Sequence, residues 1–490
     1  MGSEDGLFLR GATRLTVDRG LVGLLGLGPE APEPDAFWLI ESGRALLLAE
    51  SIANREALLE AHLPEELGLR EASSRAELDG LRAEWLRLRA AHPVDAGALA
   101  ALDARLEAAR AARRDVVARV QREARRAGEL VYPRPVELAE LRARLPAGAA
   151  LVLYHLLPER ALALVVHRGG QRLHDLGPSG EVLAAARAWR AFVSTPEAPD
   201  GATAARAYAA LVAPLEAGLA AHEHLIVAPD GVLTFLPFEA LVLPDGRRLL
   251  ERWRVSYVPS ATVYVSLREA ALAHGPARGL LAVADPVYAA ETPPAELALR
   301  GAGGLRRLPA TAEEALGIAA LFPEGEARVL LRGRATRGSL EAALDATEGR
   351  LAALHLACHG LVDEERPELS GLVLSGGEIL GLDALHRREV PAALAVLSAC
   401  DTARGPLERG EGVWGLVRGF FAAGTPSVVV ADWRVPDGST RELMLAFYRH
   451  LVAGDLPPAE ALRRAKLELL RRGGAEAHPH HWAGFVLWGL

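Results

Sequence analysis

The chain has 490 residues, of which 50% are hydrophobic and 24% are charged, and its formal net charge is −8. These values predict a soluble globular protein of about two or three domains and argue against a general nucleic-acid binder. Two cysteines, Cys358 and Cys400, are too few for a disulfide framework and predict a reducing, cytoplasmic setting. No secretory signal opens the sequence and no apolar run reaches the roughly 20 residues that span a bilayer, so we expect neither export nor membrane insertion.

The first part of the chain, residues 1–133, is predicted to be helical. Apolar residues recur at three- and four-residue steps, first at Leu78, Leu81, Trp85 and Leu88 and, after a break at His92-Pro93, at Leu99, Leu102 and Leu106. This pattern predicts a helical hairpin. Its arginine-rich second helix could be a solvated face or a docking face with a regulatory role.

Residues 134–273 have a different character. Two β-rich runs, ALVLYHLL and ALALVVH, are separated by Pro158 and closed by Gly169-Gly170, as in a hairpin. HLIVAPDG and VSYVP are typical of buried strands, and an alanine-rich helix is expected around residues 204–221. Strands that alternate with helices indicate a mostly parallel sheet.

The same alternation resumes over residues 274–490. Its apolar runs are GLLAVAD, ARVLL, LAALHLACHG, ALAVLSACD and PSVVVADW. We therefore predict an α/β fold in which a mostly parallel sheet is flanked by helices, built from two consecutive α/β units behind the helical region.

His359 and Cys400 each end one of these apolar runs. Functional groups in a parallel α/β sheet lie at the carboxyl ends of the strands, so neighbouring runs would bring the two side chains to one edge. An imidazole that raises the thiolate population of a cysteine provides the minimal apparatus for acyl transfer. The N–H groups of Gly360 and Cys400 could hold the oxyanion. Taken singly, however, a buried cysteine is usually an inert apolar residue.

Cys358 is the second cysteine of the chain. It precedes His359 directly, so the alternation of side chains along a strand turns it toward the core. We do not expect it to be the nucleophile.

The sequence resembles the CHAT domains, peptidases of the caspase and separase clan. The segments that carry the resemblance are LHLACHG, LSACDT, residues 410–437 and the closing HWAGFVLWG, with weaker echoes in LPATAEEA, GRAT and ESGRALLL. The resemblance implies a catalytic dyad of Cys400 and His359. It also implies a tandem of caspase-like units, in which residues 134–273, which contain no cysteine, are a degenerate unit and residues 274–490 the active one.

The segment ADWRVPD resembles the strand edge on which relatives of this kind bind an extended peptide by β-augmentation. Trp433 could wall the primary pocket, with Arg434 beside it. The carboxylate of Asp432 could select a basic side chain or could serve as a cap or loop hydrogen bonder, and Asp401 is a second candidate for the pocket floor.

These features favour a cysteine endopeptidase that cleaves specific proteins and uses no metal or organic cofactor. His478, His480 and His481 lack partners at zinc-like spacing, and the glycine-rich segments lack the lysine of a phosphate loop. The resemblance implies a role in bacterial defence or programmed cell death, with a gasdermin-like or other effector encoded nearby as substrate, a possible activating protein, and no direct contact with nucleic acid or membrane. The alternative is a catalytically silent regulatory scaffold.

Overall fold

The computed structural model describes residues 135–196, 202–273, 275–288, 305–361, 371–381, 388–398 and 411–490, with residues 33–44, 384–385 and isolated positions from 18 to 112. Most of the predicted helical hairpin lies outside the described residues. Its described positions are helical, and Arg105 Nη1 lies 3.4 Å from Glu84 Oε2, which links the two predicted helices.

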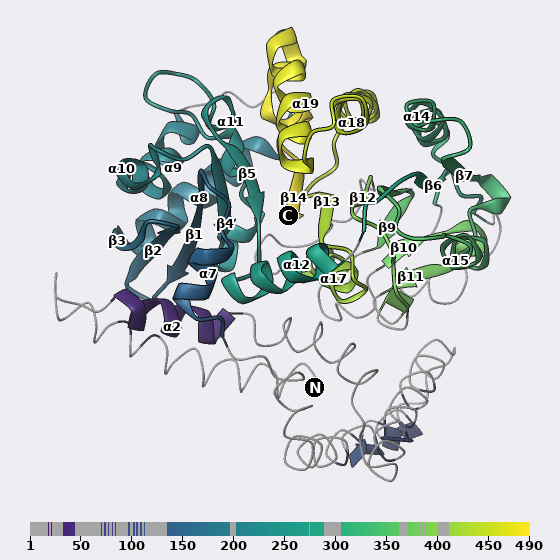
Figure 1. Cartoon of the computed structure of the whole chain (residues 1–490), viewed down its shortest axis with the longest axis horizontal. Coiled ribbons are helices and arrows are strands. Elements are labelled where there is room, and N and C mark those ends of the chain that lie inside the picture. Colours follow the sequence, from purple (N-terminus) through teal and green to yellow (C-terminus); the bar gives the residue numbers. More distant parts are fainter. Residues whose placement is uncertain are drawn as a thin grey trace.

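One sheet of 11 strands crosses the molecule in the order β3-β2-β1-β4-β5-β14-β13-β12-β8-β6-β7 (Figure 1). Its strands are β1 (Ala149–Leu156), β2 (Arg160–His167), β3 (Gly170–Pro178), β4 (His224–Ala228), β5 (Arg254–Tyr257), β6 (Leu280–Ala284), β7 (Ala327–Leu331), β8 (Ala353–Ala357), β12 (Ala395–Leu397), β13 (Ser427–Ala431) and β14 (Phe485–Gly489). Antiparallel pairing is confined to β1-β2, β2-β3 and β13-β14. The prediction of a mostly parallel α/β sheet flanked by helices is confirmed.

Helices cover both faces of this sheet (Figure 1). They are α2 (Glu33–Arg44), α7 (Leu138–Arg144), α8 (Ser179–Val193), α9 (Thr203–Leu211), α10 (Glu216–Leu219), α11 (Leu249–Arg252), α12 (Ala261–Ala273), α14 (Pro309–Ala319), α15 (Arg337–Asp345), α17 (Glu411–Ala422), α18 (Asp437–Val452) and α19 (Pro458–Arg472). Because helices lie on both sides, β4, β6, β8, β12 and β13 are buried on both faces, which explains their continuous apolar runs. Among the described helices, none has the length and apolar composition to cross a membrane.

The two predicted units share this single sheet. Strands β1 to β5 come from the first unit and β6 to β14 from the second, and the last strand of the chain, β14, lies between β13 and β5. The seam is therefore closed by the carboxyl-terminal HWAGFVLWG segment. The relation between the units as a degenerate and an active copy stays a prediction.

Two local predictions differ from the structure. The helix expected around residues 204–221 is interrupted near Pro214, so that α9 is followed by a short 3₁₀ turn and by α10. A proline inside a helix removes a backbone hydrogen bond and clashes with the preceding turn. The sequence also failed to reveal β3, an edge strand whose side chains are mostly half exposed and follow no clear alternation.

Helix α2 contains the start of the ESGRALLL segment and docks on the first unit. The carboxylate of Glu41, which is 2% exposed, accepts hydrogen bonds from the backbone N–H groups of Ala261 and Thr262 at 3.1 and 2.7 Å. These N–H groups belong to the first turn of α12, where no intrahelical acceptor exists. Glu41 thereby caps α12 from a segment more than 200 residues earlier in the sequence.

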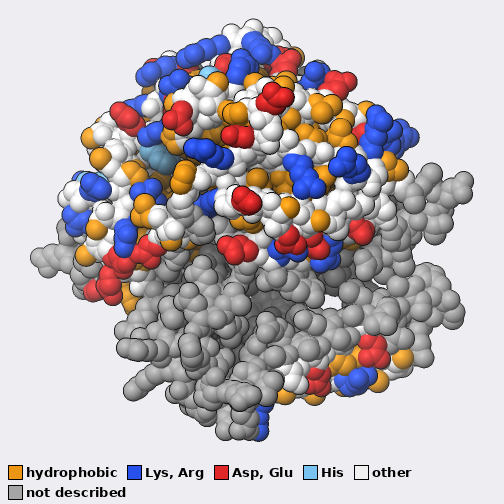
Figure 2. Space-filling model, turned by 45° about the vertical axis from the view of Figure 1, so that its right-hand side comes forward, with side chains coloured by type: hydrophobic (Ala, Val, Ile, Leu, Met, Phe, Trp, Pro, Cys, Tyr) orange, Lys and Arg blue, Asp and Glu red, His pale blue; other side chains and the backbone are white. Residues whose placement is uncertain are grey.

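A small second sheet lies beyond the end of β8. It consists of β9 (His359–Leu361), β10 (Gly371–Val373) and β11 (Ile379–Gly381), all antiparallel. On the face of the molecule in Figure 2, acidic and basic side chains are interspersed over the described surface. This mixture agrees with the modest net charge of −8.

Candidate active site

The carboxyl ends of β8 and β12 lie side by side. The two strands pair in parallel, with Leu397 opposite Leu356, and the N–H of Ser398 donates to the carbonyl of Leu356 at 2.9 Å. His359 follows β8 after one residue. The two apolar runs are thus neighbouring strands, which is the condition under which their carboxyl ends meet at one edge. Cys400 and Asp401 lie outside the described residues.

The imidazole of His359 is held on two sides. Its Nε2 lies 2.7 Å from the carbonyl oxygen of Arg306, and its ring packs against that of Tyr288 with 5.3 Å between centroids. A carbonyl oxygen can only accept, so Nε2 carries the hydrogen and the neutral imidazole has its lone pair on Nδ1. Nδ1 is therefore the nitrogen that can take a proton from a thiol.

Cys358 is fully buried, as the strand alternation predicts. Burial raises the pKa of its thiol to about 12. A thiol in this state is almost entirely protonated at neutral pH and is a poor nucleophile. Gly360, the next residue but one, is also buried and pairs with Leu372 of β10.

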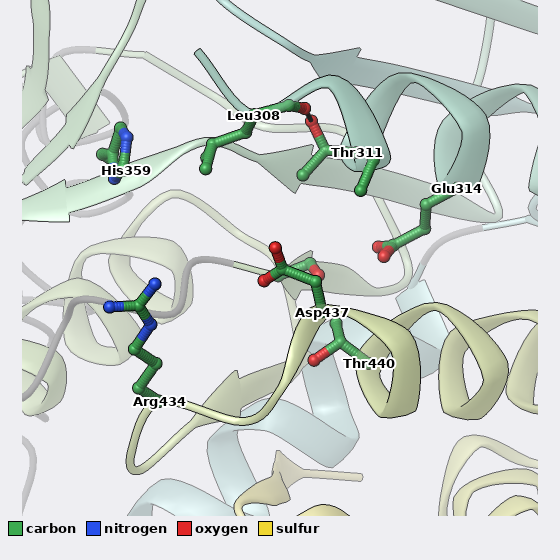
Figure 3. Close-up of a pocket in the computed structure, with 9 residues that line it drawn as sticks. Leu308, Thr311, Glu314, His359, Arg434, Asp437 and Thr440 are labelled. Carbon is green, nitrogen blue, oxygen red and sulfur yellow. Dashed lines mark hydrogen bonds between the residues drawn. The ribbon is translucent and has the colours of Figure 1, made fainter. Parts of the chain in front are cut away.

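A pocket opens beside His359 (Figure 3). Its wall is formed by three parts of the chain: the segment that begins α14, the ends of β8 and β12, and the segment that begins α18. The polar side chains in it are Thr311, Glu314, His359, Ser398, Arg434, Asp437 and Thr440. Figure 3 shows His359 and Arg434 at one end, Glu314 at the other, and Asp437 between them.

The carboxylate at the Glu314 end is held by a buried network. Glu314 Oε1 lies 3.0 Å from Nε2 of His355, whose Nδ1 lies 3.3 Å from the hydroxyl of Tyr448. His355 is fully buried and Glu314 is 2% exposed. Because a carboxylate accepts from the imidazole N–H, the hydrogen bond from His355 fixes the orientation of the Glu314 carboxylate.

Asp432 and Trp433 do not line this pocket. Asp432 is 6% exposed, and the guanidinium of Arg190 on α8 donates from Nη2 to its carbonyl oxygen at 2.8 Å. Burial raises the pKa of the Asp432 carboxyl to about 7, an effect that nearby Arg190 opposes. The same guanidinium lies 4.8 Å above the ring of Trp433.

Trp433 is held in place by the carboxyl-terminal part of the chain. Its Nε1–H donates to the carbonyl of His480 at 3.0 Å, and a Cβ added to Gly484 would lie 3.0 Å from its ring. The HWAGF segment thus leaves room for the indole. His481 Nδ1 lies 2.9 Å from the hydroxyl of Ser439, and among the described residues no group of three or more His, Cys, Asp or Glu could hold a metal ion.

Of the residues predicted to bind substrate, the structure therefore brings Arg434 to the side of His359, and it places Asp432 and Trp433 against α8. Sequence reasoning missed Glu314, Ser398 and Thr440. The sequence favoured Asp437 as a cap of the following helix, whereas the structure places it in the pocket wall. The position of Ser398, two residues before Cys400 at the end of a strand, was a usable signal. Glu314 lies in α14 and Thr440 in α18, and no local sequence pattern indicates that these two helices meet at one pocket.

The model of the CHAT domain matches residues 201–490, which is more than half of the chain. The chain belongs to the CHAT domain family. The CHAT match begins before β4, so it includes β4 and β5 of the first unit together with β14, the strand that pairs with β5.

Individual curated relatives match only a short part of this chain. Tetratricopeptide repeat protein 28 of Homo sapiens is 33% identical over 123 residues, and that of Mus musculus is 34% identical over the same length. The matched part is 25% of this chain but only 5% of each of those proteins.

Among solved structures, the separase–securin complex of Saccharomyces cerevisiae matches 98% of this chain and 37% of the other, with 10% identity and a TM-score of 0.44. The Arg specific cysteine proteinase gingipain R matches 55% of this chain and 63% of its own, with 9% identity and a TM-score of 0.34.

Proposed function

We propose that this chain is a cysteine endopeptidase in which Cys400 is the nucleophile and His359 the general base and acid. The observation that supports it best is the position of His359 at the carboxyl end of β8, beside the end of β12, where the sequence continues Ser398-Ala399-Cys400. Chain connectivity keeps the Cα atom of Cys400 within about 7 Å of that of Ser398. Ser398 and His359 line the same pocket.

The proposed reaction follows from the tautomer of His359. Nδ1 takes the thiol proton, the thiolate of Cys400 attacks the scissile carbonyl carbon, and the negative charge moves to the carbonyl oxygen. The N–H groups of Gly360 and Cys400 are the proposed donors to that oxyanion. When the C–N bond breaks, the imidazolium returns the proton to the leaving amine. Water, deprotonated by the same imidazole, then hydrolyses the thioester and regenerates the thiol.

The substrates we propose are specific proteins that are cut in an extended segment. The resemblance to CHAT peptidases is the ground for placing the activity in bacterial defence or programmed cell death, with a gasdermin-like or other effector encoded nearby as substrate. An activating protein is a further proposal on the same ground.

Alkylation kinetics test the dyad. The wild type, Cys400→Ala, His359→Ala and Cys358→Ala are treated with iodoacetamide, and the labelled sites are mapped by mass spectrometry. We expect fast labelling of Cys400 in the wild type and the Cys358→Ala variant, and slower labelling in His359→Ala, because the imidazole stabilises the thiolate. Cys358 stays unlabelled in the folded protein, since it is fully buried and burial raises its pKa to about 12.

Cleavage of a peptide library is the second readout. Loss of Cys400 or His359 should reduce kcat by on the order of 10³-fold or more, and loss of Cys358 should not. If Cys400 is labelled as slowly as Cys358, or if labelling is indifferent to His359, the dyad is not activated. The protein is then better described as a CHAT scaffold without peptidase activity.

A further inference from the structure

The pocket beside His359 contains two buried hydroxyl groups without partners. Ser398 is 3% exposed and Thr440 is 4% exposed, and neither Ser398 Oγ nor Thr440 Oγ1 has a hydrogen-bond partner within the described part of the chain. A buried hydroxyl without a partner has lost the hydrogen bonds that it makes to water in the unfolded chain. Since both side chains line one pocket, a polar group that enters it would satisfy them.

Acceptors dominate the inner part of this pocket. Glu314 is oriented by His355, which occupies Oε1 at 3.0 Å. Asp437 lies between Glu314 and His359 in Figure 3, and it forms no ion pair with any described residue. Two carboxylates and two hydroxyls can therefore accept hydrogen bonds from one ligand group.

Among the described residues that line the pocket, Arg434 is the only arginine or lysine, and it lies at the end opposite Glu314. In Figure 3 its guanidinium is near the His359 end, far from Glu314, and the residue is exposed. Solvent screens a charge in such a position. The exposed Arg434 therefore does not neutralise the carboxylates of Glu314 and Asp437, and the Glu314 end of the pocket is negative.

We infer that this pocket binds a lysine or arginine side chain of the residue that supplies the scissile carbonyl, with Asp437 as its ion-pair partner and Glu314, Ser398 and Thr440 as further acceptors. The inference rests on the proposed function, because only a nucleophile at Cys400 makes this pocket the one next to the cleaved bond. A long basic side chain has the apolar stem to pass Leu308 at the wall and carries several N–H donors, three in lysine and five in arginine, for these acceptors.

The carboxylate that selects the substrate is therefore Asp437 and not Asp432. Asp432 was the candidate from the sequence, but it is buried, its backbone carbonyl binds Arg190, and it is absent from the pocket wall. Five residues further along, Asp437 is exposed and lines the pocket. Substitution by asparagine is therefore expected to remove the preference for lysine at Asp437 and to leave it intact at Asp432.

The test uses peptidyl acyloxymethyl ketones that differ only in the residue next to the reactive carbonyl: lysine, norleucine, which has the same four-carbon side chain without the ammonium group, or glutamate. The rate at which each reagent labels Cys400 is followed by mass spectrometry. We expect the lysine reagent to react at least about 10 times faster than the other two in the wild type. Asp437→Asn should reduce the ratio of the lysine rate to the norleucine rate, both measured on the same variant, about 10- to 100-fold.

Further variants separate a charge effect from damage to the fold. Asp437→Lys should shift the preference to the glutamate reagent. Glu314→Gln should weaken the lysine preference, and Glu313→Gln is its matched control, because Glu313 is the exposed neighbour on the same helix, paired with Arg441 at 3.0 Å. Asp432→Asn should leave the preference intact.

The outcomes distinguish this inference from the proposed function. Equal or faster labelling by the norleucine or glutamate reagent overturns the inference, while His359-dependent alkylation of Cys400 by iodoacetamide still supports the peptidase. A lysine preference that survives in Asp437→Asn also overturns it. If neither iodoacetamide nor any peptidyl reagent reaches Cys400, the peptidase proposal fails and the inference with it.

Discussion

Asp432 and Asp437 belong to one short segment and have opposite surroundings. Asp432 follows β13 directly and is 6% exposed, with the guanidinium of Arg190 beside it. Asp437 begins α18, is exposed, and faces the pocket that contains His359. One carboxylate therefore lies at the contact between the two α/β units, and the other at the edge where chemistry is proposed.

The segment from Asp432 to Asp437 is held in place by contacts with both α/β units. Arg190 belongs to α8 of the first unit, yet it binds the backbone of Asp432 and covers Trp433. On the other side, Gly484 and His480 of the carboxyl-terminal segment hold the indole. The pocket residues Arg434 and Asp437 thus extend from a backbone that is fixed by both units.

Removal of the Arg190 guanidinium should have the largest effect on stability. In Arg190→Met the backbone carbonyl of Asp432 loses a charged hydrogen-bond donor and the buried carboxyl loses its neighbouring cation, so we expect the free energy of unfolding to fall by about 1.5 to 3 kcal/mol. Denaturant unfolding followed by circular dichroism measures this change. Arg187→Met, an exposed position on the same helix, should change the value by less than about 0.5 kcal/mol.

A double variant isolates the pair. If the cost of Arg190→Met comes from the uncompensated carboxyl, Asp432→Asn in the same background should recover part of it, so the two substitutions would not be additive. Additive losses would mean that Arg190 stabilises the protein through its hydrogen bond to the backbone carbonyl of Asp432 and its packing on Trp433, and not through the carboxyl.

Much of the fold could be predicted from the sequence because its central strands are buried on both faces. Their apolar runs stand out, and alternation along β8 is enough to send Cys358 to the core while His359 follows the strand. Strand β3 escaped detection because an edge strand with half-exposed side chains has no such signal.

The pocket could be predicted only in part. His359 and Arg434 were accessible from motifs, but the orientation of Asp432 depends on Arg190, which is 242 residues earlier in the chain. Glu314 lies in the second turn of α14 and Thr440 in the first turn of α18, and these two helices meet only in the folded protein. No local pattern carries information on such contacts, since they result from tertiary packing.

The buried carboxyl should also give a pH-dependent stability. Burial raises the pKa of Asp432 to about 7 in the folded state, well above its ordinary value. The folded state then retains a proton that the unfolded state has lost, so between about pH 4 and pH 7 the free energy of unfolding should decrease as pH rises, by up to about 1.4 kcal/mol per pH unit. Urea titrations at several pH values, on the wild type and Asp432→Asn, measure this difference.

In Asp432→Asn this component disappears, so the variant should gain stability relative to the wild type as the pH rises through that window. Asp437→Asn serves as the control for removal of one carboxylate from the same segment. Wild-type and Asp432→Asn curves that run parallel with pH would show that the Asp432 carboxyl does not carry the proton.

The smallest stability effect is expected at Asp437. Its carboxylate lies in the first turn of α18, where a negative charge interacts favourably with the helix dipole, and Asp437→Asn should cost only about 0.3 to 1 kcal/mol. Thermal unfolding of both asparagine variants at one pH measures the contrast. The same Asp437→Asn protein is the one expected to lose its preference for lysine reagents. A loss of stability at Asp437 as large as that of Arg190→Met would mean that its carboxylate supports the fold, and the assignment of recognition to Asp437 and of structure to Asp432 would then be wrong.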